Sequence, residues 1–216
     1  MTETQFLSHL LRHEFVYKPA RNFDVNFDET LDFMIHTEHI LRDEWHDSSH
    51  NVLSINEGSS ETVWFLAMLV WPFVDIYWII ANSLKELLPD KILSTKEFAQ
   101  KISSNAAAKY YEGEIDFFEC VGFHSITNAL RWFQTKGILT SQSVQIRKST
   151  FLTQNRGTTV SVFQLSKGYR TEEAIQEWIH HIEQYRKPMI GRPRRRDKQS
   201  QKSRSFGSPA VSQSKL

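Results

Sequence analysis

A single cysteine, Cys120, occurs in this chain of 216 residues, so no disulfide can form within it. A lone thiol is typical of proteins from a reducing compartment. The N-terminus has no basic region ahead of a long apolar core, which argues against a secretory signal. The composition, 40% hydrophobic and 24% charged, excludes a wholly disordered chain and allows one domain or two small ones.

The signatures of several common catalytic sites are also missing. The sequence contains no Gly-x-Ser-x-Gly nucleophile turn, no glycine-rich phosphate loop and no His-Glu-x-x-His zinc motif. Four histidines, His36, His39, His46 and His50, occur close together, but no established zinc pattern joins them and no cysteine pair is near. We therefore predict neither a metal site nor a cofactor.

Charge is distributed unevenly along the chain. Residues 189–216 contain eight Lys and Arg and one Asp, a net charge of +7, which leaves −6 for residues 1–188. The basic segment is rich in Arg, Ser, Pro, Gly and Gln, and we predict a disordered tail there. Clustered cations can bind nucleic acid or an anionic membrane. Most such segments are only solvated, and we predict no nucleic-acid partner.

The tail ends in Ser214, Lys215 and Leu216. At an extreme C-terminus this tripeptide is the address that the peroxisomal import receptor reads. The end of an exposed basic tail is a place that a receptor can reach. The sequence therefore predicts the import receptor as a partner and the peroxisome as the location.

The most hydrophobic stretch is residues 62–84, and its apolar run from Val63 to Ala81 is almost long enough to cross a membrane as a helix of about 20 residues. Pro72 and Asp75 interrupt it, so we expect two helices that meet at Pro72 rather than one span. These helices would form a hairpin over residues 62–88, either buried in a core or resting on a membrane. In the second case the predicted membrane contacts are the aromatic rings of Trp64, Trp71, Tyr77 and Trp78.

The remaining patterns predict a mostly α (α+β) fold. Apolar residues at helical spacing predict helices near the N-terminus and within residues 26–45, 94–111, 117–137 and 171–187. Polar and apolar residues alternate over residues 138–165 around an Asn-Arg-Gly turn, which indicates a β-hairpin and, with the helices, a winged-helix-like unit. We divide the chain into a helical region with the hydrophobic hairpin (1–90), helices plus β-hairpin (91–188) and the tail (189–216).

Three segments carry a family resemblance. They are "FLSHLLRHEFVYKP", "WPFVDIYWIIANSL" and "FHSITNALRWFQTKGIL", with the motifs Leu-Arg-x-Glu-Phe, Pro-Phe-Val-Asp-x-Tyr and Asn-Ala-Leu. In this order they resemble the C-terminal part of the glycerol-3-phosphate and dihydroxyacetone-phosphate acyltransferase family, over residues 4–165. The resemblance implies transfer of an acyl group from acyl-CoA in glycerolipid synthesis. The C-terminal Ser-Lys-Leu favours the peroxisomal branch, which acylates dihydroxyacetone phosphate for ether lipids.

The chain departs from that family in one respect. The family's general base is the histidine of a His-x-x-x-x-Asp pair, and none of the nine histidines here has Asp five positions later. We therefore expect no catalytic residue in this chain, which alone should be inactive and should act on acyl-CoA only through an upstream catalytic domain. The expected role is to hold that domain at the matrix side of the peroxisomal membrane. The alternative is a stand-alone, non-enzymatic winged-helix-like interaction module with a basic tail.

Overall fold

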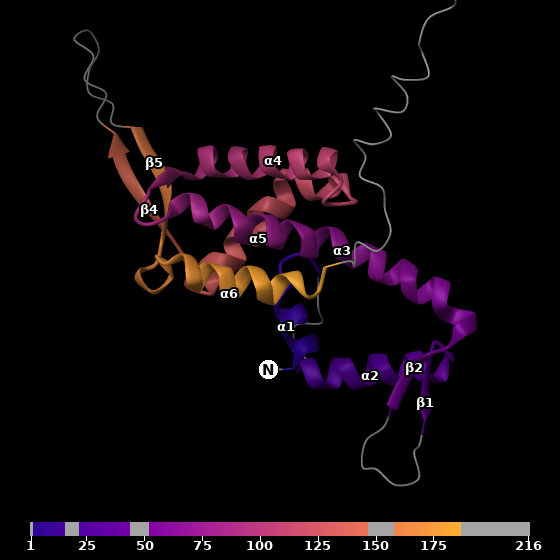
Figure 1. Ribbon diagram of the computed structural model, residues 1–216. Helices are drawn as coiled ribbons and strands as arrows, with labels where there is room; N and C mark the ends of the chain where they lie inside the picture. Colours follow the sequence, from indigo (N-terminus) through magenta and orange to yellow (C-terminus); the bar gives the residue numbers. More distant parts are fainter. Residues whose placement is uncertain (1, 16–21, 44–51, 147–157, 187–216) are drawn as a thin grey trace, which may run out of the picture.

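Helix α3 runs through the centre of the molecule, and the other helices of the body pack around its C-terminal half (Figure 1). The structure is a computed structural model that describes residues 2–15, 22–43, 52–146 and 158–186. The helices are α1 (Glu3–Leu10), α2 (Phe23–His36), α3 (Ser60–Ser83), α4 (Thr95–Glu112), α5 (Phe123–Thr135) and α6 (Glu172–Glu183). The strands are β1 (Ile40–Asp43), β2 (Val52–Ile55), β3 (Leu93–Ser94), β4 (Leu139–Ile146) and β5 (Thr158–Leu165). The predicted mostly helical fold with a small antiparallel sheet is confirmed.

The predicted pair of helices meeting at Pro72 is wrong, because α3 is one continuous helix with Pro72 inside it. At about 1.5 Å per residue, its 24 residues span about 36 Å. The proline removes one backbone hydrogen bond, but the residues that follow are held by the core. From Pro72 to Ser83 nearly every side chain is buried, and packing of that half outweighs the local cost.

One hydrophobic core joins the first and the last described helices. Its buried residues come from α1, α3, α4, α5, α6 and the β4–β5 hairpin. Ile76, Ile79 and Ile80 of α3 are fully buried, and so are Ile102 of α4 and Ile175 of α6. The division that we placed at residue 90 therefore does not separate two cores, since elements on both sides of it enclose α3.

The strands form two small antiparallel sheets. In the larger sheet the order is β3-β5-β4, and the predicted hairpin pairs Leu139 with Leu165 at its base. In the smaller sheet β1 pairs with β2. The helix predicted over residues 26–45 ends sooner than expected, at His36, and is followed by a left-handed residue, Glu38 (φ 57°), and then by β1.

Short-range signals set other helix boundaries as expected. The Ser94 hydroxyl accepts a hydrogen bond from the Glu97 backbone N–H (3.1 Å) and caps the start of α4. Gly137 follows α5 with φ 71°, a left-handed conformation that glycine adopts without steric cost. The predicted tail lies outside the described residues.

Candidate functional site

The four predicted membrane-contact residues separate into two pairs. Trp64 is 52% exposed, and the half-buried Trp71 lies against it with ring centroids 5.1 Å apart. Tyr77 and Trp78 lie in the core, 0% and 7% exposed. For Tyr77 and Trp78 the predicted contact is wrong, because no membrane can reach these rings while the protein is folded.

The N-terminal half of α3, residues 60–71, differs from the half that follows it. None of its residues is buried, and residues 62–74 carry no charged side chain. Exposed apolar residues surround most of its surface: Trp64, Phe65, Leu66, Met68 and Leu69. A solvated helix normally carries polar residues on its outer face, and an apolar patch of this kind marks an interaction site. We call residues 60–71 the exposed half of α3.

The segment Glu57–Leu87 is long and apolar enough to cross a membrane, with a mean hydropathy of 1.9, although 39% of its apolar window is buried inside the protein. Length and composition of this kind also occur in core helices. Within this segment, the exposed half of α3 is the apolar part that is open to a membrane or a partner.

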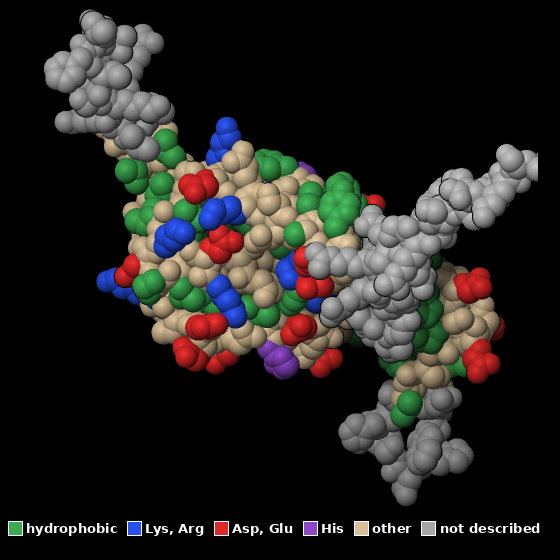
Figure 2. Space-filling model, turned by 45° about the horizontal axis from the view of Figure 1, so that its top comes forward, with side chains coloured by type: hydrophobic (Ala, Val, Ile, Leu, Met, Phe, Trp, Pro, Cys, Tyr) green, Lys and Arg blue, Asp and Glu red, His purple; other side chains and the backbone are tan. Residues whose placement is uncertain are grey.

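Acidic residues are concentrated on α2 and at the start of α3. In Figure 2 red side chains gather at the end of the molecule formed by α2 and the start of α3, whereas red and blue are mixed over the body. Helix α2 contains four acidic residues and no Lys or Arg: Asp24, Asp28, Glu29 and Asp32. Glu57 and Glu61 add to the negative charge where α3 begins.

The three motifs that carry the family resemblance meet at one carboxylate. Asn128 of α5 donates a hydrogen bond from Nδ2 to Oε2 of Glu14 (3.1 Å). The Tyr77 hydroxyl of α3 lies near the same carboxyl group and affects its pKa. Burial raises the pKa of Glu14, while the hydrogen bond from Asn128, the nearby His124 and the nearby Tyr77 hydroxyl oppose that rise. Glu14 thus joins the segment after α1 to α3 and α5.

A second long-range contact supports the same junction. The indole Nε1 of Trp132 on α5 donates to the backbone oxygen of His9 on α1 (2.8 Å). Burial, together with the positive charges of Arg12 and Arg131, lowers the pKa of His13 beside it. These contacts hold the short N-terminal helix α1 against the body of the protein.

Asp75, the acidic residue in the middle of the hydrophobic stretch, is only 4% exposed. It accepts a hydrogen bond from Nε of Arg186, at the end of α6, at 2.7 Å. The same guanidinium lies 3.6 Å from the Trp78 ring centroid and donates to the backbone oxygen of Glu114 (2.8 Å). A buried carboxylate needs such a partner. The sequence alone did not identify Arg186, which is 111 residues away.

Cys120 is the one cysteine of the chain, and it is buried. Its thiol donates to the backbone oxygen of Pro72 at 3.0 Å. Burial raises the pKa of the Cys120 thiol far above its usual range, and the nearby Asp75 carboxylate adds to the effect. A thiol of this kind is a packing residue rather than a nucleophile.

The described residues include no group of three or more His, Cys, Asp or Glu side chains arranged to hold a metal ion. His39 lies on the loop before β1, and its Nδ1 is 3.0 Å from the Ser59 hydroxyl. His46 and His50 lie outside the described residues, and so do Ser214, Lys215 and Leu216.

The fold and these contacts define a helical region in which three motifs meet at the half-buried Glu14 carboxylate. A family model described as the glycerol-3-phosphate acyltransferase C-terminal region matches residues 1–142. The chain therefore belongs to this family and is related to glycerolipid acyltransferases. The match includes all three motifs and ends within β4, so β5 and α6 lie beyond it. A search of curated proteins finds no match.

Proposed function

We propose that this chain is the non-catalytic C-terminal portion of a peroxisomal acyltransferase. In this proposal an upstream catalytic domain transfers the acyl group from acyl-CoA to dihydroxyacetone phosphate, or to glycerol 3-phosphate, in ether-lipid or glycerolipid synthesis. The observation that carries the proposal is the family match over residues 1–142 in a chain without a His-x-x-x-x-Asp pair. Extending the genomic sequence upstream of Met1 tests it. An in-frame block with that pair supports the proposal, and its absence favours a stand-alone interaction module.

The second part of the proposal is that this region holds the enzyme at the membrane surface on the matrix side. It is supported by the exposed half of α3, whose apolar side chains cover more than two turns without a charge. Amphipathic rings such as that of Trp64 prefer the boundary between water and lipid. The buried half of α3 is held in the core by contacts that include the Asp75–Arg186 pair, so attachment would be peripheral rather than spanning.

Vesicle flotation tests this attachment. Trp64→Ser, Phe65→Ser and Leu69→Ser together should abolish binding to phosphatidylcholine vesicles without lowering the thermal midpoint. Tyr111→Ser is the matched control, because Tyr111 on α4 is 67% exposed and lies outside the exposed half of α3. Binding by the triple variant that equals wild-type binding would contradict the proposal, as would retention of wild-type protein in membranes after alkaline carbonate.

Peroxisomal location is proposed from Ser214, Lys215 and Leu216. A fluorescent protein fused ahead of residue 1, in a chain that ends at Leu216, should give peroxisomal puncta. Deletion of the last three residues should move the signal to the cytosol, and Leu216→Lys should do the same without shortening the tail. Puncta that persist in both variants would assign import to another signal or to a partner.

A further inference from the structure

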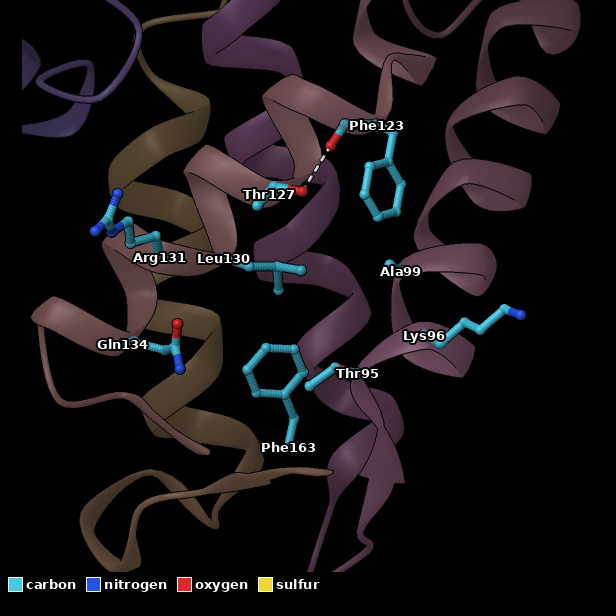
Figure 3. A pocket seen from close by; sticks show the side chains of 9 residues that line it. All are labelled: Thr95, Lys96, Ala99, Phe123, Thr127, Leu130, Arg131, Gln134 and Phe163. Carbon is cyan, nitrogen blue, oxygen red and sulfur yellow. Dashed lines mark hydrogen bonds between the residues drawn. The ribbon is translucent and has the colours of Figure 1, made fainter. Parts of the chain in front are cut away.

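A groove of about 500 Å³ lies between α4 and α5 (Figure 3). The residues that line it are Thr95, Lys96, Ala99, Phe123, Thr127, Leu130, Arg131, Gln134 and Phe163. Its floor is apolar, formed by Ala99, Leu130 and Phe163. Phe123 lies at one end and is 69% exposed. An exposed phenylalanine beside an apolar floor is a favourable place for another apolar surface to bind.

Two cations lie on opposite sides of this groove, Arg131 on α5 and Lys96 on α4 (Figure 3). Neither forms an ion pair within the described part of the chain. Other basic residues of the body do form such pairs with Asp or Glu, namely Lys85, Lys101, Lys109, Arg170 and Arg186. The groove therefore combines an apolar floor with two positive charges that have no carboxylate partner there, and it suits an occupant that is apolar and acidic.

Helix α2 has the complementary properties. None of its residues is buried. Val25, Glu29 and Phe33 follow one another at intervals of four residues and so lie along one side of the helix. Asp28 and Asp32 lie beside that line. Phe33 is 63% exposed, so α2 presents an aromatic side chain flanked by carboxylates.

The groove and α2 lie at opposite ends of the molecule, so they cannot meet within one copy (Figure 1). We propose that α2 of one copy binds in the α4–α5 groove of a second copy, with Phe33 on the apolar floor and the acidic residues beside Lys96 and Arg131. An amphipathic helix placed in an apolar groove is a common recognition mode. The interface is heterologous, because each copy offers a different surface to its neighbour. This inference does not rest on the proposed function.

Charge reversal in the full-length chain tests the proposal by analytical ultracentrifugation. The groove variant carries Lys96→Glu and Arg131→Glu, and the α2 variant carries Asp28→Lys and Asp32→Lys. All four positions are exposed, so each variant should fold. Wild type should self-associate, and each variant alone should associate at least about tenfold more weakly. An equimolar mixture should form a one-to-one dimer, since the intact α2 of the groove variant meets the intact groove of the α2 variant.

The chain that carries all four substitutions should self-associate again, because both charges of the interface are reversed. Phe33→Ser should weaken association at least tenfold, whereas Tyr111→Ser, at an equally exposed aromatic, should not. Three results would each overturn the proposal: a monomeric wild type, association unchanged by both charge variants, or a mixture that stays monomeric. A monomeric wild type that instead binds a fluorescent fatty acid, with loss of binding in the groove variant, would assign the groove to a lipid.

Discussion

Replacing Arg186 by Met should destabilise the fold more than any substitution at a surface ion pair, because it leaves the Asp75 carboxylate buried without its cation. The side chains of Arg186 and Asp75 are 13% and 6% exposed, and the bond between them is 2.7 Å long. Removing one partner of a buried pair costs about 3–5 kcal/mol. The substitution also removes the guanidinium from the Trp78 face and from the backbone oxygen of Glu114. We expect a loss of about 4 kcal/mol at neutral pH.

Urea denaturation followed by circular dichroism measures this loss. For a slope of about 2 kcal/mol per molar urea, the midpoint of Arg186→Met should fall by about 2 M. Adding Asp75→Asn removes the uncompensated charge while keeping a hydrogen-bonding amide, so the double variant should recover about half of the loss.

The matched control is Lys85→Met. Lys85 pairs with Glu172 at 3.2 Å, but the two side chains are 34% and 68% exposed, so water screens the pair. Its removal should change stability by no more than about 0.5 kcal/mol. The reasoning is refuted if Arg186→Met and Lys85→Met lose the same small amount, or if Asp75→Asn fails to restore any stability to Arg186→Met.

Three further predictions concern the buried groups and the activity of the chain. Burial raises the pKa of Glu14 above 4.5, the ordinary value for a glutamate side chain. The contribution of protonated Glu14 to stability is therefore present below pH 4.5 and is lost as the pH rises through the pKa of Glu14 in the folded state. Glu14→Gln cannot ionise, so its stability relative to wild type should increase from pH 4 to pH 7, and parallel pH profiles would contradict this. Cys120 should react with a thiol reagent only on unfolding, and Cys120→Ser should abolish the signal. If the folded protein in native buffer reacts at a rate close to that of the unfolded chain, the Cys120 thiol is accessible and the prediction is wrong. Purified chain should show no transfer from acyl-CoA to dihydroxyacetone phosphate or glycerol 3-phosphate, and turnover above a heat-denatured control would place a catalytic base within it.

Local rules in the sequence determine most of the secondary structure. Helical spacing of apolar residues places α1, α4, α5 and α6, and strict alternation places the β4–β5 hairpin. The helix cap at Ser94 and the helix stop at Gly137 depend only on residues close to them in the sequence. Such signals can therefore be predicted without knowledge of the tertiary structure. The order of the three motifs was also sufficient to identify the family, which we expected over residues 4–165 and whose model matches residues 1–142.

Tertiary structure decided what the hydrophobic stretch does. Both halves of α3 are strongly apolar, so hydropathy does not distinguish the half that enters the core from the half that stays exposed. Proline is a local signal for a break, yet packing on α5 and α6 keeps the helix continuous through Pro72. The partners of Asp75 and Glu14 lie 111 and 114 residues away, at Arg186 and Asn128. Such pairs depend on how the helices pack, because no local pattern in the sequence specifies which distant side chain will lie beside a buried charge.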